Sequence, residues 1–378
     1  MYRMKMYDEY DFKVEKTEGI KIWDDRGRKY LDTFSGIGVL ALGHSNPEVL
    51  EAQRLQMIKY EHISNFFFQD NAEDIARILV KNTGRTGQVF FTNSGTEAIE
   101  AALKAVKKKS GMTGKKIILT FENAFHGRTL GSLSLNGFEH LRTPFEPLFE
   151  NIIRIPFNDQ EAFEKTFGEN VDEIIAVFVE PVLGSGGVVP IDRKLADSIS
   201  TLTSKKDVLL VADEIQAGIG RTGKFYSYQH YGLSPDIITL GKAIGGGLPL
   251  GATIFLNGSE MIFQQGDHGS TFAPNPVSLA GGRIVVGKVE NILNDIREKG
   301  IYFSKRLHKT QKIKEIRQIG LMIGIELMNE DKHLRDKAIE KGLLINMIKN
   351  RIIRILPAFS ITYDEIDEMT DLLNDLIE

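Results

Sequence analysis

Short apolar runs alternate with amphipathic segments through the middle of the chain. The runs are rich in Ile, Val, Leu and Phe, which is typical of buried strands, and the segments between them have the spacing of helices. This alternation predicts βαβ units and a mostly parallel sheet. The predicted strands are 88–92, 116–120, 152–155, 174–180, 208–213, 237–240 and 252–256.

The two ends of the chain show a different pattern. Residues 20–32 alternate around an Asp-Arg-Gly turn, which predicts a hairpin. From about residue 279 the pattern changes to one long helix followed by two strands. The elements predicted at the ends are helices 46–59 and 285–307, strands 313–319 and 322–327, and a last helix with a capping box formed by Thr362 and Glu365.

These patterns predict an α/β protein with two domains. Residues 46–284 would form a large α/β domain around the parallel sheet. Residues 1–45 and 285–378 would together form a small α+β domain. A chain of 378 residues is long for a single core, so this division agrees with its length.

Composition narrows the classes of function. The formal net charge of −4 argues against nucleic acid or an anionic membrane as a partner. The absence of cysteine excludes disulfides and thiolate nucleophiles and agrees with a cytoplasmic protein. The eight histidines show no zinc-ligand spacing, so no metal site is expected. Neither a signal peptide nor a membrane span is expected.

Lys242 and Asp213 carry the strongest chemical signal. Asp213 closes one predicted strand, and Lys242 follows the next. In open α/β sheets, ligands bind outside the carboxyl ends of the strands. An amine and a carboxylate brought there together suit pyridoxal phosphate, which the amine holds as a Schiff base while the acid pairs with the ring nitrogen. The alternative for Asp213 is a cap on the next helix.

Ser94, Gly95 and Thr96 follow the first predicted strand and open a helix at 98–107. The structural interpretation is a helix cap by Ser94, with Glu97 completing a capping box. The functional interpretation is a phosphate cradle made of free amides, a hydroxyl and a glycine that permits close approach. The two interpretations are compatible, because a good cap is also an anion site.

Two further segments follow predicted strands. Phe125 is placed to stack on a flat ring, and Arg128 to clamp a carboxylate; the alternatives are a core Phe and a surface Arg. Glu180 adds an acid at a third strand end. Ser270 and Thr271 offer hydroxyls on a loop rich in Gly and Pro.

The glycine run at 218–223 matches the G-x-G-x-x-G pattern of dinucleotide sites and nearly matches a P-loop. Both matches fail on context. A P-loop needs Ser or Thr where Phe225 stands, and the dinucleotide motif begins directly after a strand, whereas four residues intervene here. The run is better interpreted as a flexible active-site loop.

Taken together, these residues resemble the class III (ω-type) aminotransferases, which are fold-type I pyridoxal phosphate enzymes, and most of all the acetylornithine and ornithine aminotransferases. The likeness extends from about residue 23 to Arg354. The matching runs are Asn93-Ser94-Gly95-Thr96-Glu97-Ala98, Phe125-His126-Gly127-Arg128-Thr129, Asp213-Glu214-Ile215-Gln216, Gly220-Arg221-Thr222-Gly223, Gly241-Lys242 and His268-Gly269-Ser270-Thr271-Phe272.

The resemblance implies a role for each matching residue. Lys242 would be the Schiff-base lysine and general base, Asp213 the partner of the ring nitrogen, and Gln216 a contact to the ring hydroxyl. Gly95 and Thr96 would bind the phosphate, and Phe125 would stack on the ring. Thr271 would contact the phosphate in the neighbouring subunit of a homodimer. Arg128, with Ser270 nearby, would bind the donor's α-carboxylate, and Arg354 would bind the carboxylate of 2-oxoglutarate or glutamate.

One departure from the family pattern concerns Ser185. Many of these enzymes carry a glutamate in the Gly184-Ser185-Gly186 segment, where it pairs with the arginine matching Arg354. Serine cannot neutralise a guanidinium. The hypothesis is that Arg354 stays available to carboxylates in both half-reactions.

The resemblance leaves the donor open. The leading prediction is acetylornithine aminotransferase, which transfers the ω-amino group to 2-oxoglutarate. Alternatives are an aminotransferase for ornithine, succinyldiaminopimelate, lysine or another ω-amino acid, or an aminomutase of the same fold. A catalytically silent binding relative is the non-enzymatic alternative, and the presence of Lys242, Asp213 and Thr271 speaks against it.

Overall fold

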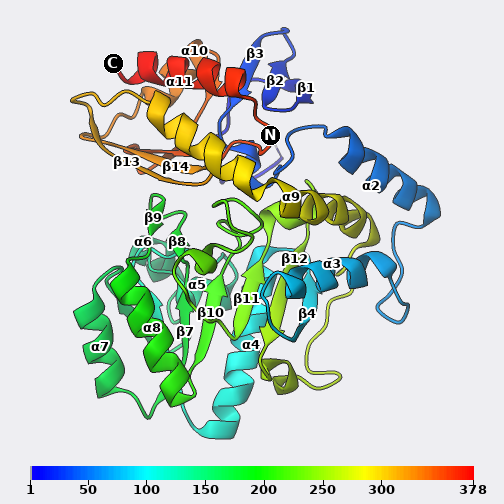
Figure 1. Cartoon of the computed structure of the whole chain (residues 1–378), viewed down its shortest axis with the longest axis vertical. Helices are drawn as coiled ribbons and strands as arrows, with labels where there is room; N and C mark the ends of the chain where they lie inside the picture. The colour runs from blue at the N-terminus through cyan, green and yellow to red at the C-terminus, as the bar shows by residue number, and fades with distance from the viewer. Residues whose placement is uncertain (1) are drawn as a thin grey trace.

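The computed structural model describes residues 2–378, and a seven-stranded sheet lies at its centre (Figure 1). The sheet order is β4-β12-β11-β10-β7-β5-β6. β12 runs antiparallel to both of its neighbours, and the other pairs are parallel, so the prediction of a mostly parallel sheet is confirmed. The strands are β4 (Gly87–Thr92), β5 (Ile117–Phe121), β6 (Ile152–Ile155), β7 (Ile174–Val179), β10 (Leu209–Asp213), β11 (Ile237–Leu240) and β12 (Gly251–Leu256).

Helices cover both faces of this sheet. Alternate residues of β10 belong to different apolar clusters: Leu210 packs with α8 (Arg193–Lys206), whereas Val211 packs with α4 (Gly95–Thr113). Because successive strand residues point to opposite faces, α8 and α4 lie on opposite sides. Strands buried on both faces are apolar throughout, which explains the continuous apolar runs in the sequence.

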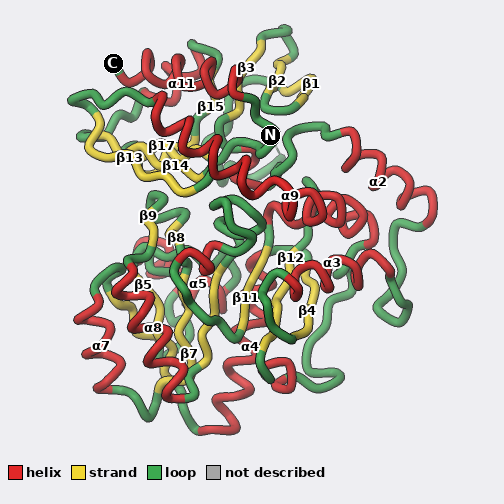
Figure 2. The backbone as a smooth tube through the Cα atoms, viewed as in Figure 1, coloured by secondary structure: helices red, strands yellow, loops and turns green. Residues whose placement is uncertain are grey.

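The long helix begins earlier than predicted. α9 spans Pro276–Arg306, with Asn275 as its N-cap, rather than beginning at residue 285. Two glycines, Gly281 and Gly282, lie in its first turns. They are required by packing, because a Cβ at Gly281 would lie 2.4 Å from the Gln53 side chain and one at Gly282 would lie 2.4 Å from the carbonyl oxygen of Ile244. Figure 2 shows α9 running from the region of α2 (Pro47–Lys59) and α3 (Asp70–Lys81) to the smaller sheets.

The two chain ends form smaller sheets side by side (Figure 1). The predicted hairpin is confirmed as β2 and β3, and the capping box of the last helix is also confirmed. Parallel pairing of β15 with β3 joins the two ends of the chain. One sheet contains β1 (Val14–Glu18), β2 (Lys21–Asp24), β3 (Lys29–Asp32) and β15 (Leu343–Leu344), and the other contains β13 (Ile313–Ile319), β14 (Met322–Leu327), β17 (Ile352–Ile355) and β16 (Asn346–Ile348).

The remaining elements are short, apart from the C-terminal helix. They are the helices α1 (Ser35–Gly38), α5 (Leu130–Leu135), α6 (Glu139–Arg142), α7 (Gln160–Glu169), α10 (Leu334–Glu340) and α11 (Tyr363–Ile377), the 3-10 turns η1 (Thr143–Phe145), η2 (Ser227–His230), η3 (Lys242–Gly245) and η4 (Ser259–Ile262), and the strand pair β8 (Val182–Leu183) and β9 (Val189–Pro190).

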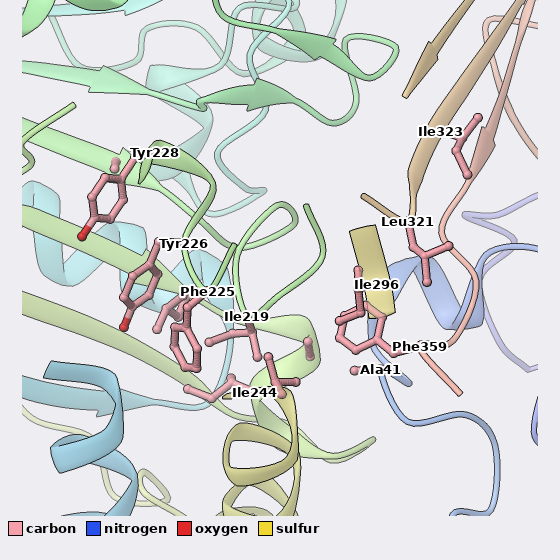
Figure 3. Close-up of a cluster of buried hydrophobic side chains, with 14 of the residues drawn as sticks. Ala41, Ile219, Phe225, Tyr226, Tyr228, Ile244, Ile296, Leu321, Ile323 and Phe359 are labelled. Carbon is pink, nitrogen blue, oxygen red and sulfur yellow. The ribbon is translucent and has the colours of Figure 1, made fainter. Parts of the chain in front are cut away.

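Arg221, in the middle of the glycine run, connects the central sheet to the C-terminal part of the chain. Arg221 is 2% exposed, and its Nη1 donates to the carbonyl oxygens of Leu321 and Pro357 at 2.9 and 2.6 Å. It lies over the ring of Phe359, 4.4 Å from the centroid. Figure 3 shows Leu321 and Phe359 in the same apolar region as Ile219. The prediction of a flexible active-site loop at 218–223 is therefore wrong, because the run is buried structural packing.

Among residues 2–378, no helix combines the length and the apolar content needed to cross a bilayer.

Replacing Arg221 with leucine should lower the free energy of unfolding by about 2–4 kcal/mol, because the buried carbonyls of Leu321 and Pro357 lose their donor. Urea unfolding followed by circular dichroism measures the change. Arg193→Leu is the matched control, since that arginine forms an exposed pair with Asp197 on α8 and should change stability by less than about 1 kcal/mol. Equal losses in the two variants would contradict the structural role of Arg221.

Candidate functional site

The carboxyl ends of three neighbouring parallel strands bring ionisable groups to one edge of the central sheet. Asp213 is the last residue of β10, Glu180 follows β7, and Lys242 follows β11 by two residues. The sequence analysis placed each of these residues at a strand end, and the structure confirms it. Lys242 has a φ of +50°, which is uncommon for a residue with a side chain and marks a constrained position.

The amine of Lys242 has a lowered pKa. Burial lowers the pKa from its ordinary value to about 8, and the charge of Arg354 acts in the same direction, whereas the charges of Asp213 and Glu180 oppose the shift. A lysine with this pKa has a substantial neutral fraction near neutral pH. Its amine can therefore attack a carbonyl carbon.

Asp213 is held by His126, a residue to which the sequence analysis gave no role. Nδ1 of His126 lies 2.7 Å from Oδ2 of Asp213, and both side chains are buried. The other carboxylate oxygen of Asp213 accepts from the backbone N–H of Ile215 at 3.0 Å. Burial opposes protonation of His126, but its hydrogen bond to Asp213 and the charges of Asp213 and Glu180 raise its pKa. The two contacts fix the orientation of the Asp213 carboxylate.

Glu180 supports the loop that carries Phe125. Its Oε2 accepts from the backbone N–H of Phe125 at 2.7 Å, and its Oε1 accepts from that of Gly184 at 3.1 Å. Burial raises the pKa of Glu180 to about 7, and the charge of Asp213 adds to the shift. Phe125 is half-buried, and the exposed Arg128 lies over its ring, with its guanidinium carbon 5.4 Å from the centroid.

The N-terminus of α4 is the second part of the site. Ser94 is the N-cap, and its Oγ accepts from the N–H of Glu97 at 3.3 Å. The predicted capping box is wrong in its other half, because Oε2 of Glu97 accepts from the backbone and side chain of Asn93 instead of from Ser94. Within residues 2–378, no hydrogen bond engages the N–H groups of Gly95 and Thr96. Such groups at a helix N-terminus bind phosphate.

Glycines let this helix end approach the strand that delivers Lys242. A Cβ on Gly241 would lie 3.0 Å from the backbone of Gly95, and a Cβ on Gly95 would lie 2.8 Å from the side chain of Ile215. The anion-binding helix end, the reactive amine and the buried Asp213 are thus packed together. This arrangement fits pyridoxal phosphate, which needs a phosphate site, an amine and an acid around one aromatic ring.

Arg354 lies on β17 and points to the same site. Arg354 is 6% exposed, and its Nη1 donates to Oε1 of Gln216 at 3.1 Å. Nε and Nη2 both donate to Oδ1 of Asn346, at 3.0 and 2.8 Å. Burial lowers the pKa of Arg354 to about 10, so the group stays charged at neutral pH. Asn346 was missed by the sequence analysis, and the ring contact expected of Gln216 stays a prediction.

The loop with Ser270 and Thr271 lies near the N-cap of α4. Oγ of Ser270 accepts from the side-chain amide of Asn93 at 3.1 Å, and Thr271 is exposed. No hydrogen bond among the described residues joins this loop to Lys242 or Arg354. The roles implied for Ser270 and Thr271 therefore stay predictions.

Comparisons with known proteins agree with this geometry. A family model described as aminotransferase class-III matches residues 2–377. An acetylornithine aminotransferase of Aquifex aeolicus (strain VF5) is 40% identical over 378 residues, covering 100% of both chains. A LysW-aminoadipate semialdehyde/glutamate semialdehyde transaminase of Sulfolobus acidocaldarius is 37% identical over 382 residues, covering 99% of this chain and 97% of the relative.

Among solved structures, the ornithine aminotransferase of Toxoplasma gondii matches with a TM-score of 0.92 and 28% identity. The match covers 100% of this chain and 91% of that one, and pyridoxal phosphate partially occupies the active site of that protein. The fold expected from the sequence, that of the fold-type I pyridoxal phosphate enzymes, is confirmed.

The lowered pKa of Lys242 predicts how the cofactor-free protein captures pyridoxal phosphate. Only the neutral amine attacks the aldehyde, so the capture rate should rise with pH through a midpoint of about 8. Stopped-flow absorbance measures this rate. Asp213→Asn removes a charge that opposes the shift and should move the midpoint lower. A midpoint at the ordinary lysine value, or continued capture by Lys242→Arg, would contradict the assignment.

Proposed function

The chain belongs to the class-III aminotransferase family, and from this premise we propose that it transfers the terminal amino group of acetylornithine to 2-oxoglutarate, giving a semialdehyde and glutamate. As a member of that family it is a pyridoxal-phosphate-dependent transaminase. The observation that supports the proposal most is the placement of Lys242 and Asp213 at neighbouring strand ends, with Arg354 donating to Gln216 of the same region. Acetylornithine is the donor named for the Aquifex relative.

The residues of the site divide the binding of the cofactor among them. We assign the phosphate to Ser94, Gly95 and Thr96, the ring face to Phe125, and the ring nitrogen to Asp213. Gln216 is assigned to the ring hydroxyl, and Lys242 to the aldehyde carbon. When bound, pyridoxal phosphate supplies a protonated aromatic ring that accepts the electron pair left by breaking a C–H bond next to the amine.

Lys242 and Asp213 perform the proton chemistry. With its pKa near 8, Nζ of Lys242 serves as a neutral base that removes a proton from the carbon bearing the donor's amino group, and it returns a proton in the reverse direction. His126 and the N–H of Ile215 orient the Asp213 carboxylate. Placed so, Asp213 would pair with the ring nitrogen of the bound cofactor and favour its protonation.

Two arginines position the substrates. We assign the α-carboxylate of the donor to Arg128, which is exposed beside Phe125, with Ser270 nearby. Arg354 receives the carboxylate of 2-oxoglutarate or glutamate. Guanidinium groups bind carboxylates with two parallel hydrogen bonds, so each arginine fixes the orientation of a substrate as well as attracting it.

Ornithine is the second candidate donor, favoured by the structural similarity to the Toxoplasma enzyme. The same site would accept it if Arg128 holds its α-carboxylate, since the two donors differ only in acylation of the α-amine.

The domain limits at 46 and 284 and the cytoplasmic location stay predictions.

We further propose that the protein is a homodimer with shared active sites. Phe66, Phe67 and Phe68 are 95%, 64% and 75% exposed, and monomers rarely expose a contiguous apolar patch of this kind. Asn65 joins this patch to the loop of Thr271, since its side-chain amide donates to the carbonyl oxygens of Ser270 and Ala273 at 2.8 and 3.0 Å. A second subunit that packs on Phe66, Phe67 and Phe68 would therefore also contact Thr271.

Lys242→Ala should abolish transamination and leave the thermal unfolding temperature unchanged. The measurement mixes cofactor-loaded protein with acetylornithine, ornithine and other ω-amines and follows the visible absorbance of the cofactor. Wild type should convert the cofactor fastest with acetylornithine. Lys224→Ala, a change of an exposed lysine in a neighbouring loop, should retain full activity. Turnover by Lys242→Ala would refute the mechanism. Faster conversion with another donor would show that this donor, and not acetylornithine, is the substrate.

Phe66→Asp should weaken the dimer by about tenfold or more, because it places a charge in an apolar interface. Light scattering over a concentration series measures the mass, and dialysis measures cofactor retention, which should fall together with dimerisation if Thr271 reaches the partner's phosphate. Phe145→Asp is the matched control, since Phe145 is also exposed but lies in η1. A monomeric wild type would contradict the proposal.

A further inference from the structure

The guanidinium of Arg354 is buried without a carboxylate partner. Its three hydrogen bonds go to two neutral amides, those of Asn346 and Gln216. Among residues 2–378, no acidic side chain forms an ion pair with it. The charge of Glu180 acts on Arg354 without contacting it. Burying a charge without an ion-pair partner is costly, so its persistence at this place points to a ligand that supplies the paired negative charge.

The hydrogen bonds leave a defined part of the guanidinium unused. A guanidinium has five N–H donors. Asn346 takes one from Nε and one from Nη2, and Gln216 takes one from Nη1. One N–H on each terminal nitrogen remains. A carboxylate that binds arginine in the bidentate mode needs two parallel donors of this kind.

Asn346 is held firmly in the position from which it bonds Arg354. The two residues face each other across the antiparallel pair β16 and β17, and directly opposite residues of such a pair lie on the same face. The preceding residue is also fixed, because the carbonyl oxygen of Ile345 accepts from the hydroxyl of Tyr10 at 2.9 Å. Asn346 therefore orients the guanidinium from the side of the small sheet.

We propose that Asn346 is a positioning residue for the amino acceptor: its neutral oxygen orients Arg354 without cancelling the charge that attracts the acceptor's carboxylate. This inference rests on the proposed function, in which Arg354 binds 2-oxoglutarate. Aspartate has nearly the same shape as asparagine and would keep both hydrogen bonds. It would also neutralise the guanidinium in advance and so compete with the substrate.

The segment with Gly184 and Ser185 also brings no negative charge to Arg354. Gly184 packs so closely on Gln216 that a Cβ on this glycine would lie 2.2 Å from Oε1. Ser185 is therefore adjacent to the second amide that holds Arg354, and it brings no charge. A glutamate at 185 would place a carboxylate next to Gln216, the second partner of Arg354, whereas an aspartate at 346 would place one on the first partner's position.

The test compares wild type, Asn346→Asp and Ser185→Glu as cofactor-loaded enzymes. Isothermal titration calorimetry with glutarate, a dicarboxylate of the same length that cannot react, measures binding without turnover. Each variant should bind glutarate about tenfold or more weakly, since a hydrogen-bonded charge pair is lost. The KM for 2-oxoglutarate should rise by a similar factor. The half-reaction with acetylornithine should change by less than about threefold, because Arg128 holds that donor.

Asn350→Asp is the matched control, because it adds the same charge at the exposed turn between β16 and β17. It should bind glutarate as wild type does. A purely structural role for Asn346 predicts unchanged glutarate affinity in Asn346→Asp, and that result would overturn the inference. If wild type itself fails to bind glutarate, the assignment of Arg354 to the acceptor is refuted as well, which distinguishes the two failures.

Discussion

The ionisable groups at the carboxyl edge of the central sheet must keep their charges where water has little access. Each of them depends on the others. Asp213 is held by His126 and a backbone N–H, and its charge raises the pKa of His126. The amine of Lys242 is also buried, and within residues 2–378 it has no hydrogen-bonded partner, so burial lowers its pKa to about 8. Burial and the neighbouring charges at this edge therefore make Lys242 the base.

The position of Arg354 depends on packing far from the reacting atoms. It belongs to β17, three residues before Pro357, whose carbonyl oxygen accepts from the buried Arg221. Arg221 thus ties the strand that carries Arg354 to the loop that follows Asp213 and Gln216. The glycine run that resembles a nucleotide motif is tightly packed, since a Cβ on Gly220 would lie 2.5 Å from the side chain of Val289, and a Cβ on the facing Gly320 would lie 2.4 Å from the backbone of Thr222. The G-x-G-x-x-G pattern at 218–223 is therefore explained by close packing, not by phosphate binding.

The features that the sequence predicted well are local ones. Apolar runs identified the seven central strands, and residues placed directly after them, such as Lys242 and Asp213, reached the expected edge. The features that it missed depend on pairing between distant segments. His126 meets Asp213 although β7 lies between their strands, and Asn346 meets Arg354 through strand pairing that no local pattern shows. The sequence analysis placed the start of α9 too late. The glycines in its first turns are required by close packing against Gln53 and Ile244, which are distant in the sequence, so no local pattern shows the reason for them.

Left-handed backbone occurs next to the same edge of the sheet, at Lys242 and in α1. Lys242 has a φ of +50°, and in α1 two residues with side chains, Ser35 and Ile37, have φ values of +48° and +63°. α1 packs against η3, the turn that begins with Lys242. A left-handed residue with a side chain costs about 1–2 kcal/mol. Contacts with the rest of the protein must therefore hold α1 in this backbone conformation. Strain of this kind persists where the surrounding structure imposes it. For α1 that structure is η3, against which it packs, and the buried Asp32, whose carboxylate accepts from the N–H of Ser35.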